Sequence, residues 1–141
     1  MDIKRDYVMY IFVNNDLQMS KGKIASQVGH VVQKIIEDIY ENKTINQTIN
    51  KTINKTINQT INQTINKKKI DIFNRYNNWK NGSKKIILRA SYLELLELQQ
   101  ESEAVSIYDA GKTQINANSL TCIGFYPSCY NQEKFKKFKL L

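Results

Sequence analysis

The chain has 141 residues, a formal net charge of +8 and a pI near 9.4. That length suits one domain, and a charge of this sign favours nucleic acid or another polyanion as partner, although it also fits a merely soluble basic protein. The two cysteines and single histidine make neither a zinc pattern nor a disulfide framework, and no apolar run approaches the roughly 20 residues of a membrane span.

The N-terminal part predicts a strand followed by a helix. Residues 7–13 are nearly all apolar and β-rich, as expected of a central buried strand. Ser20 is a favourable N-cap for a helix that we expect to reach about Tyr40. The opening residues carry no signal-peptide pattern, so we expect a cytoplasmic protein with reduced cysteines.

Residues 44–67 are six tandem copies of Thr-Ile-Asn-(Gln/Lys). One isoleucine in four buries little surface, and Thr and Asn are poor helix formers. We interpret the repeat as a low-complexity insertion, disordered or weakly helical, within a single domain that spans residues 1–141. The alternative is a helix whose isoleucines form a slowly winding apolar stripe, which would extend the preceding helix or pair with another chain.

The second half of the chain alternates helices and strands. The expected elements are a short helix, a strand, a longer helix and two more strands, over residues 70–79, 85–90, 91–104, 105–108 and 120–126. In the longer helix, Leu93, Leu96 and, less regularly, Leu95 and Leu98 are expected to face inward. The alternation predicts an α/β domain with a mostly parallel sheet, in which one of the last two strands can run antiparallel because no helix signal separates them.

The first turn of the first helix has an unfavourable composition. Lys21, Gly22 and Lys23 follow the N-cap, although a lysine there is disfavoured by about 0.3–1 kcal/mol and a glycine costs about 1 kcal/mol relative to alanine. Bare N–H groups, the helix dipole and two ammonium groups together form an anion site. This composition therefore points to a phosphate ligand.

A polar stripe continues along the same helix. Lys23, Gln27, His30 and Lys34 fall on an arc of about 60° at helical spacing. The stripe is either a solvated face or the wall of a site, and the lysines of the first turn favour a site. His30 lies about 10 Å from the helix start, so a structural hydrogen-bonding role competes with that of a general base.

A carboxylate follows the third predicted strand. If this strand is parallel to the first, Asp109, Lys112 and Thr113 line a cleft with Lys23 at the carboxyl edge of the sheet. A carboxylate beside a lysine stays ionised and can orient or activate a water molecule. The alternative is an Asx-turn, since Asp-Ala-Gly is favourable turn chemistry. The sequence has no P-loop, GxGxxG or Gly-x-Ser-x-Gly motif.

Three segments also carry a resemblance: DLQMSKGKIASQVGH at 16–30, WKNGSKKIIL at 79–88 and DAGKTQI at 109–115. Together with LTCIGFYP at 120–127 and the closing KLL, they resemble the archaeal/eukaryotic-type peptidyl-tRNA hydrolases, also called type 2. The resemblance covers essentially everything outside the repeat.

The resemblance implies a mixed four-stranded sheet flanked by helices on both faces, usually in a homodimer. It implies hydrolysis of the ester between a peptide and tRNA, with no metal and no other cofactor. Carried over by position, the catalytic group is Lys23, Gln27, Asp109 and Thr113. The residues expected to bind the substrate, at the acceptor stem and 3′ end of the tRNA, are Lys21, Gly22, His30, Lys85 and Lys112.

The sequence departs from this family at several places. Lys112 stands where the family usually has arginine. We expect weaker phosphate contacts at this position, because lysine cannot bind phosphate bidentately. Gly29 replaces the usual alanine, and the repeat replaces a short loop between two helices. Two other functions therefore remain open: a non-catalytic RNA-binding module, and an interaction protein that works through the repeat.

Overall fold

The computed structural model describes residues 6–52, 59–111, 116 and 118–141. The elements in chain order are β1 (Met9–Asn14), η1 (Asn15–Leu17), α1 (Lys21–Thr52), α2 (Gln59–Lys80), β2 (Lys85–Ala90), α3 (Tyr92–Leu98), β3 (Ala104–Tyr108) and β4 (Leu120–Phe125). The bounds of β2 match the expected ones, and the other three strands differ from expectation by one or two residues at their ends.

The four strands form one mixed sheet in the order β2-β1-β4-β3. β1 pairs with β2 in parallel, whereas β4 runs antiparallel to both β1 and β3. The strands β1, β2 and β3 therefore all point the same way, and their carboxyl ends share one edge of the sheet. We call this the carboxyl edge. The expectation that β3 and β1 are parallel is confirmed, and β4 is the antiparallel strand.

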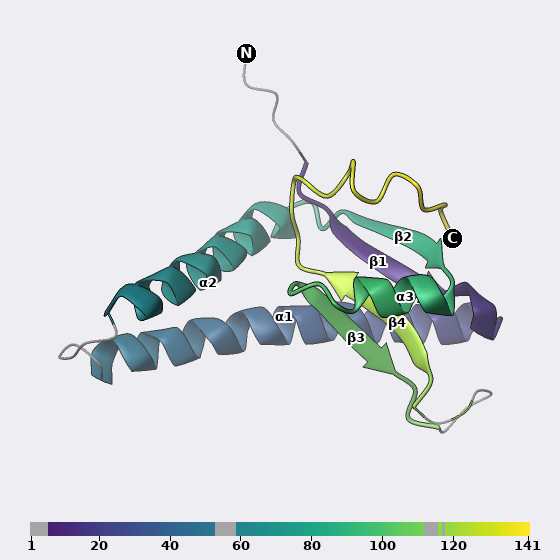
Figure 1. Cartoon of the computed structure of the whole chain (residues 1–141), viewed down its shortest axis with the longest axis horizontal. Helices are drawn as coiled ribbons and strands as arrows, with labels where there is room; N and C mark the ends of the chain where they lie inside the picture. Colours follow the sequence, from purple (N-terminus) through teal and green to yellow (C-terminus); the bar gives the residue numbers. More distant parts are fainter. Residues whose placement is uncertain (1–5, 53–58, 112–115, 117) are drawn as a thin grey trace, which may run out of the picture.

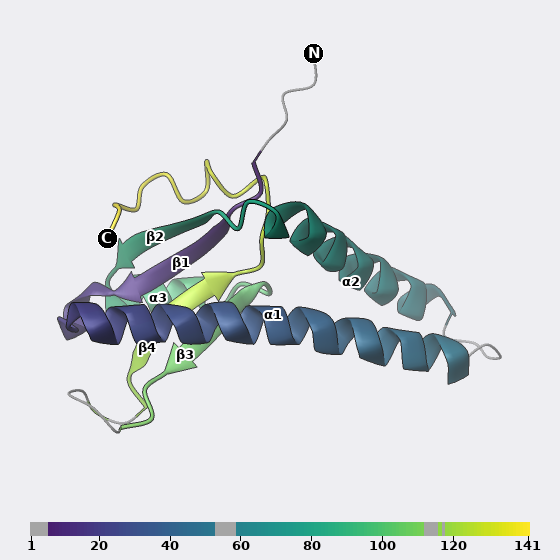
Figure 2. The same ribbon diagram turned by 180° about the vertical axis from the view of Figure 1, so that it is seen from behind.

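Helices cover both faces of the sheet, as the resemblance implies. Figure 1 views the molecule from the side of α3, and Figure 2 shows α1 lying across the opposite face. Under α1 and α2 lies a core cluster of apolar side chains that includes Met9, Ile11, Val31, Ile35, Ile39, Tyr76 and Trp79. Under α3 and the C-terminal segment lies a second cluster that includes Tyr10, Phe12, Leu95, Ile123, Phe125 and Phe135.

The two long helices extend into the repeat from both sides. α1 ends at Thr52 rather than near Tyr40, and α2 begins at Gln59 rather than at Ile70. The repeat contains neither Gly nor Pro, so it holds no strong helix-stop signal. The backbone of residues 44–52 and 59–67, the described part of the repeat, is helical, and the two helices project beyond the sheet (Figures 1 and 2). Among the described residues, no helix combines the length and apolar character of a membrane span.

The helix α3 is shorter than expected, and one of its four leucines faces outward instead of inward. A capping box between Ser91 and Glu94 sets its start, and it ends at Leu98. Leu95 and Leu98 are buried, whereas Leu93 is 72% exposed. The inward orientation expected for Leu95 and Leu98 is confirmed, and Leu96 packs against the same core cluster. The orientation expected for Leu93 was wrong, because the helix start set by the capping box turns this side chain to solvent.

The C-terminal segment packs over the sheet and closes one of its edges. The ring of Phe135 lies 4.9 Å from that of Phe12 and 5.0 Å from that of Phe125, between centroids. The last residues pair with the outer edge of β2, where Leu140 bridges to Leu88 and the Leu141 N–H donates to the Ile87 carbonyl at 3.1 Å. The free edge of β2 is thereby protected from pairing with other chains.

Candidate active site

The start of α1 brings one lysine into the protein. The Ser20 hydroxyl accepts from the Lys23 N–H at 3.2 Å, and the Ser20 carbonyl accepts from the Ile24 N–H at 2.9 Å, so Ser20 is the N-cap, as expected. Lys21 and Gly22 are exposed, whereas the Lys23 side chain is only 9% exposed. The two lysines of this turn thus lie in different environments, one in solvent and one against the carboxyl edge.

Asp109 lies at the end of β3, and backbone hydrogen bonds hold it to the start of β4. Its N–H donates to the Ser119 carbonyl at 2.9 Å, and its carbonyl accepts from the Asn118 N–H at 2.7 Å. Its Oδ2 accepts from the Gly111 N–H at 2.9 Å, and Gly111 has a φ of 77°, which favours glycine. The Asx-turn considered from the sequence is therefore present, and it orients the carboxylate.

The Lys23 ammonium forms an ion pair with Oδ1 of Asp109. The side chain of Asp109 is only 3% exposed. Water screens a pair at this depth poorly, so the attraction between the two charges is stronger than between surface residues. Removing the charge of either residue would leave the other charge buried with less opposite charge beside it. The two residues expected to face one another across the carboxyl edge do so.

Gln27 lies one helical turn after Lys23 and is 3% exposed. Its Oε1 accepts from the Thr121 hydroxyl at 2.7 Å, and Thr121 on β4 is fully buried. The same hydroxyl lies 3.1 Å from the Ile107 carbonyl, and a hydroxyl has one hydrogen to donate. The polar wall of the site therefore continues from α1 onto the sheet.

Sequence reasoning did not identify Thr121. Its signal was a polar residue in the otherwise apolar strand 120–125, which a strand buried on both faces would not be expected to contain. Its neighbour Cys122 is no candidate nucleophile, because burial raises the pKa of this thiol to about 12 and keeps it protonated at neutral pH.

Two further residues expected at the site, His30 and Lys85, have other contacts in the described part of the chain. His30 is exposed, and its Nε2 lies 3.4 Å from the Ser26 hydroxyl of the same helix. Lys85 begins β2 and pairs in register with Met9, at the edge opposite the carboxyl edge. There its ammonium lies 5.2 Å from the ring centroid of Trp79. Lys112 and Thr113 lie outside the described residues.

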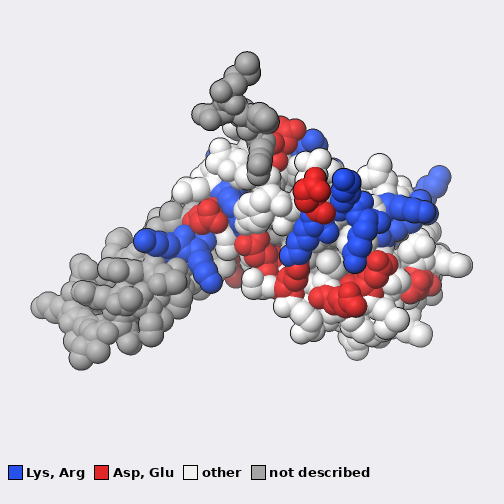
Figure 3. Space-filling view, turned by 45° about the horizontal axis from the view of Figure 1, so that its top comes forward, with Lys and Arg blue, Asp and Glu red and all other residues white. Residues whose placement is uncertain are grey.

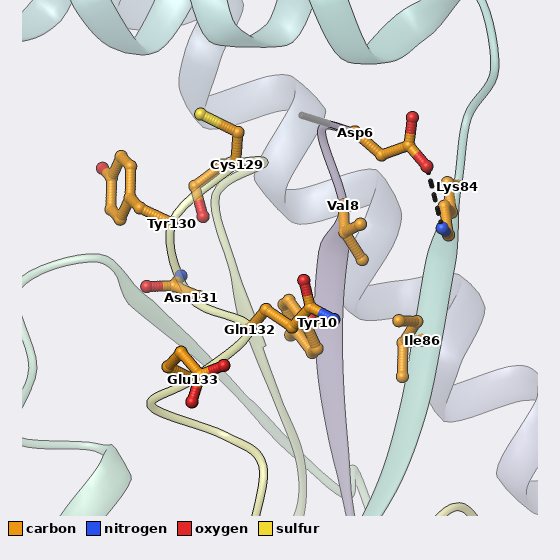
Figure 4. A pocket seen from close by; sticks show the side chains of 11 residues that line it. Asp6, Val8, Tyr10, Lys84, Ile86, Cys129, Tyr130, Asn131, Gln132 and Glu133 are labelled. Atoms are coloured by element: carbon orange, nitrogen blue, oxygen red, sulfur yellow. Dashed lines mark hydrogen bonds and ion pairs between the residues drawn. The ribbon is translucent and has the colours of Figure 1, made fainter. Parts of the chain in front are cut away.

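A pocket of about 500 Å³ also lies at that opposite edge, between the start of β1 and the C-terminal segment (Figure 4). Asp6 and Lys84 form an ion pair of 3.2 Å at its mouth, with side chains 73% and 51% exposed. Exposed pairs of this kind are strongly solvated and contribute little. The ion pair of Lys23 and Asp109 is much more deeply buried than this one.

Comparisons with known proteins identify the family of this chain. A family model described as peptidyl-tRNA hydrolase PTH2 matches residues 7–141. A peptidyl-tRNA hydrolase of Thermoplasma acidophilum is 29% identical, over 94% of this chain and 97% of the relative. Another, of Sulfolobus acidocaldarius, is 33% identical over 84% of this chain and 85% of the relative. The chain therefore belongs to the peptidyl-tRNA hydrolase PTH2 family.

Proposed function

We propose that the Lys23–Asp109 pair is the centre of an enzyme that hydrolyses the ester bond of peptidyl-tRNA, releasing the peptide and free tRNA. The observation that carries the proposal is the buried ion pair at the carboxyl edge, in a chain that matches the peptidyl-tRNA hydrolase family over nearly its whole length. Ligands of α/β sheets bind at this edge, because strand ends and helix starts meet there.

In the proposed reaction, Asp109 orients a water molecule that attacks the ester carbonyl carbon. Each oxygen of its carboxylate has two lone pairs, so the group can accept several hydrogen bonds at once, including one from water. Thr113 is assigned to help position this water. The water oxygen bonds to the carbonyl carbon, the bond between this carbon and the 3′-oxygen breaks, and the proton that the water loses ends on the 3′-oxygen.

Lys23 stabilises the negative charge that develops on the carbonyl oxygen. An ammonium has three donors, so it can contact Asp109 and the oxyanion together. A preorganised donor at an oxyanion contributes about 3–4 kcal/mol. Holding the 3′-terminal phosphates is an alternative role for Lys23, while Gln27, held by Thr121, hydrogen-bonds the substrate.

Exposed cations are available for the tRNA phosphates. Figure 3 shows lysines and arginines gathered over the C-terminal segment, with acidic residues beside them. The Arg89 N–H donates to the Lys139 carbonyl at 2.8 Å, which keeps both residues near the carboxyl end of β2. Together with Lys21, these residues form a positive rim that can bind tRNA phosphates independently of the base sequence. Lys112 and His30 are further candidates on this rim.

The test is peptide release from peptidyl-tRNA by the purified protein. We expect Lys23→Ala and Asp109→Ala each to lower kcat by about 100–1000-fold, since each removes a preorganised charge. Lys34→Ala, which removes an exposed lysine of the same helix, is the matched control. A chelator is expected to leave the rate unchanged. Near-wild-type rates in both site variants would exclude these roles.

The same assay separates the competing functions. A non-catalytic RNA-binding module would bind tRNA and release no peptide. For an interaction protein, replacing residues 44–67 with a short Gly/Ser linker would abolish partner binding, whereas we expect hydrolysis to survive because the site lies at the other end of α1.

The proposed hydrolase is a single catalytic domain with an inserted repeat, located in the cytoplasm and assembled as a homodimer.

A further inference from the structure

A groove of about 530 Å³ opens on the α3 side of the carboxyl edge. Its lining is largely apolar and aromatic and includes Leu17, Tyr92, Leu96, Tyr108 and Leu120. Tyr92 and Tyr108 are 46% and 50% exposed. It is unusual for two large side chains of one groove to be left uncovered by the rest of the described chain. The groove therefore offers an unfilled apolar surface at the edge where the ion pair lies.

The groove and the ion pair lie on opposite faces of one strand end. Tyr108 immediately precedes Asp109, and successive residues of a strand point to opposite faces. The Tyr108 hydroxyl contacts the amide of Gln99, next to α3, while the Asp109 carboxylate contacts Lys23 on α1. The backbone of Asp109 is also bonded to Asn118 and Ser119, which line the groove. A substrate lying over the edge can therefore reach both places.

The charge of the groove is opposite to that of the helix start. Among its described lining residues there is no Lys or Arg, and Asp16 is the only charged side chain. Asp16 Oδ2 accepts from the Tyr92 N–H at 2.8 Å. A carboxylate repels phosphate, so the Asp16 side chain disfavours the tRNA backbone at this place. Neutral, apolar groups are the ligands that its surface suits.

We propose that this groove binds the peptide part of the substrate and receives the side chain of the residue esterified to the tRNA. The inference rests on the proposed function, since it places the ester between the groove and the ion pair. The tRNA then approaches from the Lys21 side of the edge, and the peptide lies against α3. The groove makes the enzyme faster on apolar acyl groups than on glycine.

The test compares two substrates that differ only in the acyl group, N-acetyl-leucyl-tRNA and N-acetyl-glycyl-tRNA. The wild-type protein is expected to prefer the leucyl substrate in kcat/KM. Tyr92→Ala removes one wall of the groove and is expected to reduce that preference about tenfold, the usual effect of losing apolar contacts in a pocket. Tyr92→Phe keeps the ring and should retain the preference.

Leu93→Ala is the matched control, because Leu93 is 72% exposed on the same helix and is not among the described lining residues. It should leave the preference unchanged. If Tyr92→Ala leaves the preference unchanged, the inference is overturned, whether or not kcat/KM itself falls. An equal loss of kcat/KM for both substrates would mean that the groove holds the terminal adenosine common to both. If the wild-type protein cleaves neither substrate, the proposed function itself fails.

Discussion

The Lys23 ammonium contacts the Asp109 carboxylate across 86 positions of the chain. The contact exists because β4 pairs antiparallel with both β1 and β3, which makes β1 and β3 point the same way. The helix that follows β1 and the turn that follows β3 then start at one edge. A single long-range pairing pattern thus assembles the site.

The ion pair should also contribute to stability. Lys23→Met leaves the buried Asp109 carboxylate without its cation, and we expect the free energy of unfolding to fall by about 3 kcal/mol. Asp109→Leu should cost a similar amount. The double variant should cost clearly less than the sum, because neither buried charge then remains. Urea unfolding of all four proteins measures this, and strict additivity would contradict the coupling.

Thr121 is expected to position Gln27 for catalysis. Thr121→Val keeps the shape but leaves a buried amide oxygen of Gln27 without its donor, so the free energy of unfolding should fall by about 1–3 kcal/mol. We expect kcat on peptidyl-tRNA to fall about tenfold, which corresponds to one lost hydrogen bond. Thr121→Ser restores the hydroxyl and should recover most of the rate. If the serine variant is as slow as the valine variant, the hydroxyl is not the group that matters.

Two glycines give opposite predictions for the same substitution. A Cβ on Gly29, exposed on α1, would meet nothing within 4 Å, so Gly29→Ala should stabilise the protein by about 1 kcal/mol through helix propensity. A Cβ on Gly124 of β4 would lie 2.8 Å from side-chain atoms of Ile35 and Val31. Because both are fully buried, Gly124→Ala should destabilise by about 1–3 kcal/mol. Thermal unfolding of both variants decides the signs.

The two cysteines should differ in reactivity. Burial raises the pKa of Cys122 to about 12, so at pH 8 about one folded molecule in ten thousand carries its thiolate. A thiol reagent is expected to label only Cys129 in the native protein, and both cysteines in denaturant. Rapid labelling of both sites without denaturant would show that Cys122 is accessible.

The same shift predicts a loss of stability at high pH. Below pH 9 the Cys122 thiol is protonated in both states, whereas between about pH 9 and 12 only the unfolded chain releases its proton. The free energy of unfolding should therefore fall as the pH rises through this range. Cys122→Ala should show a shallower decline in urea unfolding measured from pH 8 upward.

Local sequence patterns identified most of the secondary structure. The apolar run of Ile86, Ile87 and Leu88 after the turn signal Asn81-Gly82 predicted the strand Lys85–Ala90 with its observed bounds, because strand propensity and turn signals act over a few residues. The N-cap at Ser20 and the anomalous lysines after it likewise pointed to Lys23 before any contact was known. Leu93 was placed wrongly because its orientation depends on where the capping box starts α3.

Which residues meet was decided by the packing of distant segments. Thr121 joins Gln27 only because β4 lies beside β3 under α1, and Lys85 lies far from the ion pair only because β2 runs parallel to β1. Residue types and short-range spacing thus indicated which side chains can act at the site, and the helix start and turn that hold them. Strand order and register, which depend on burying two apolar faces at once, determined that Lys23 and Asp109 share one buried edge while Lys85 lies at the opposite edge.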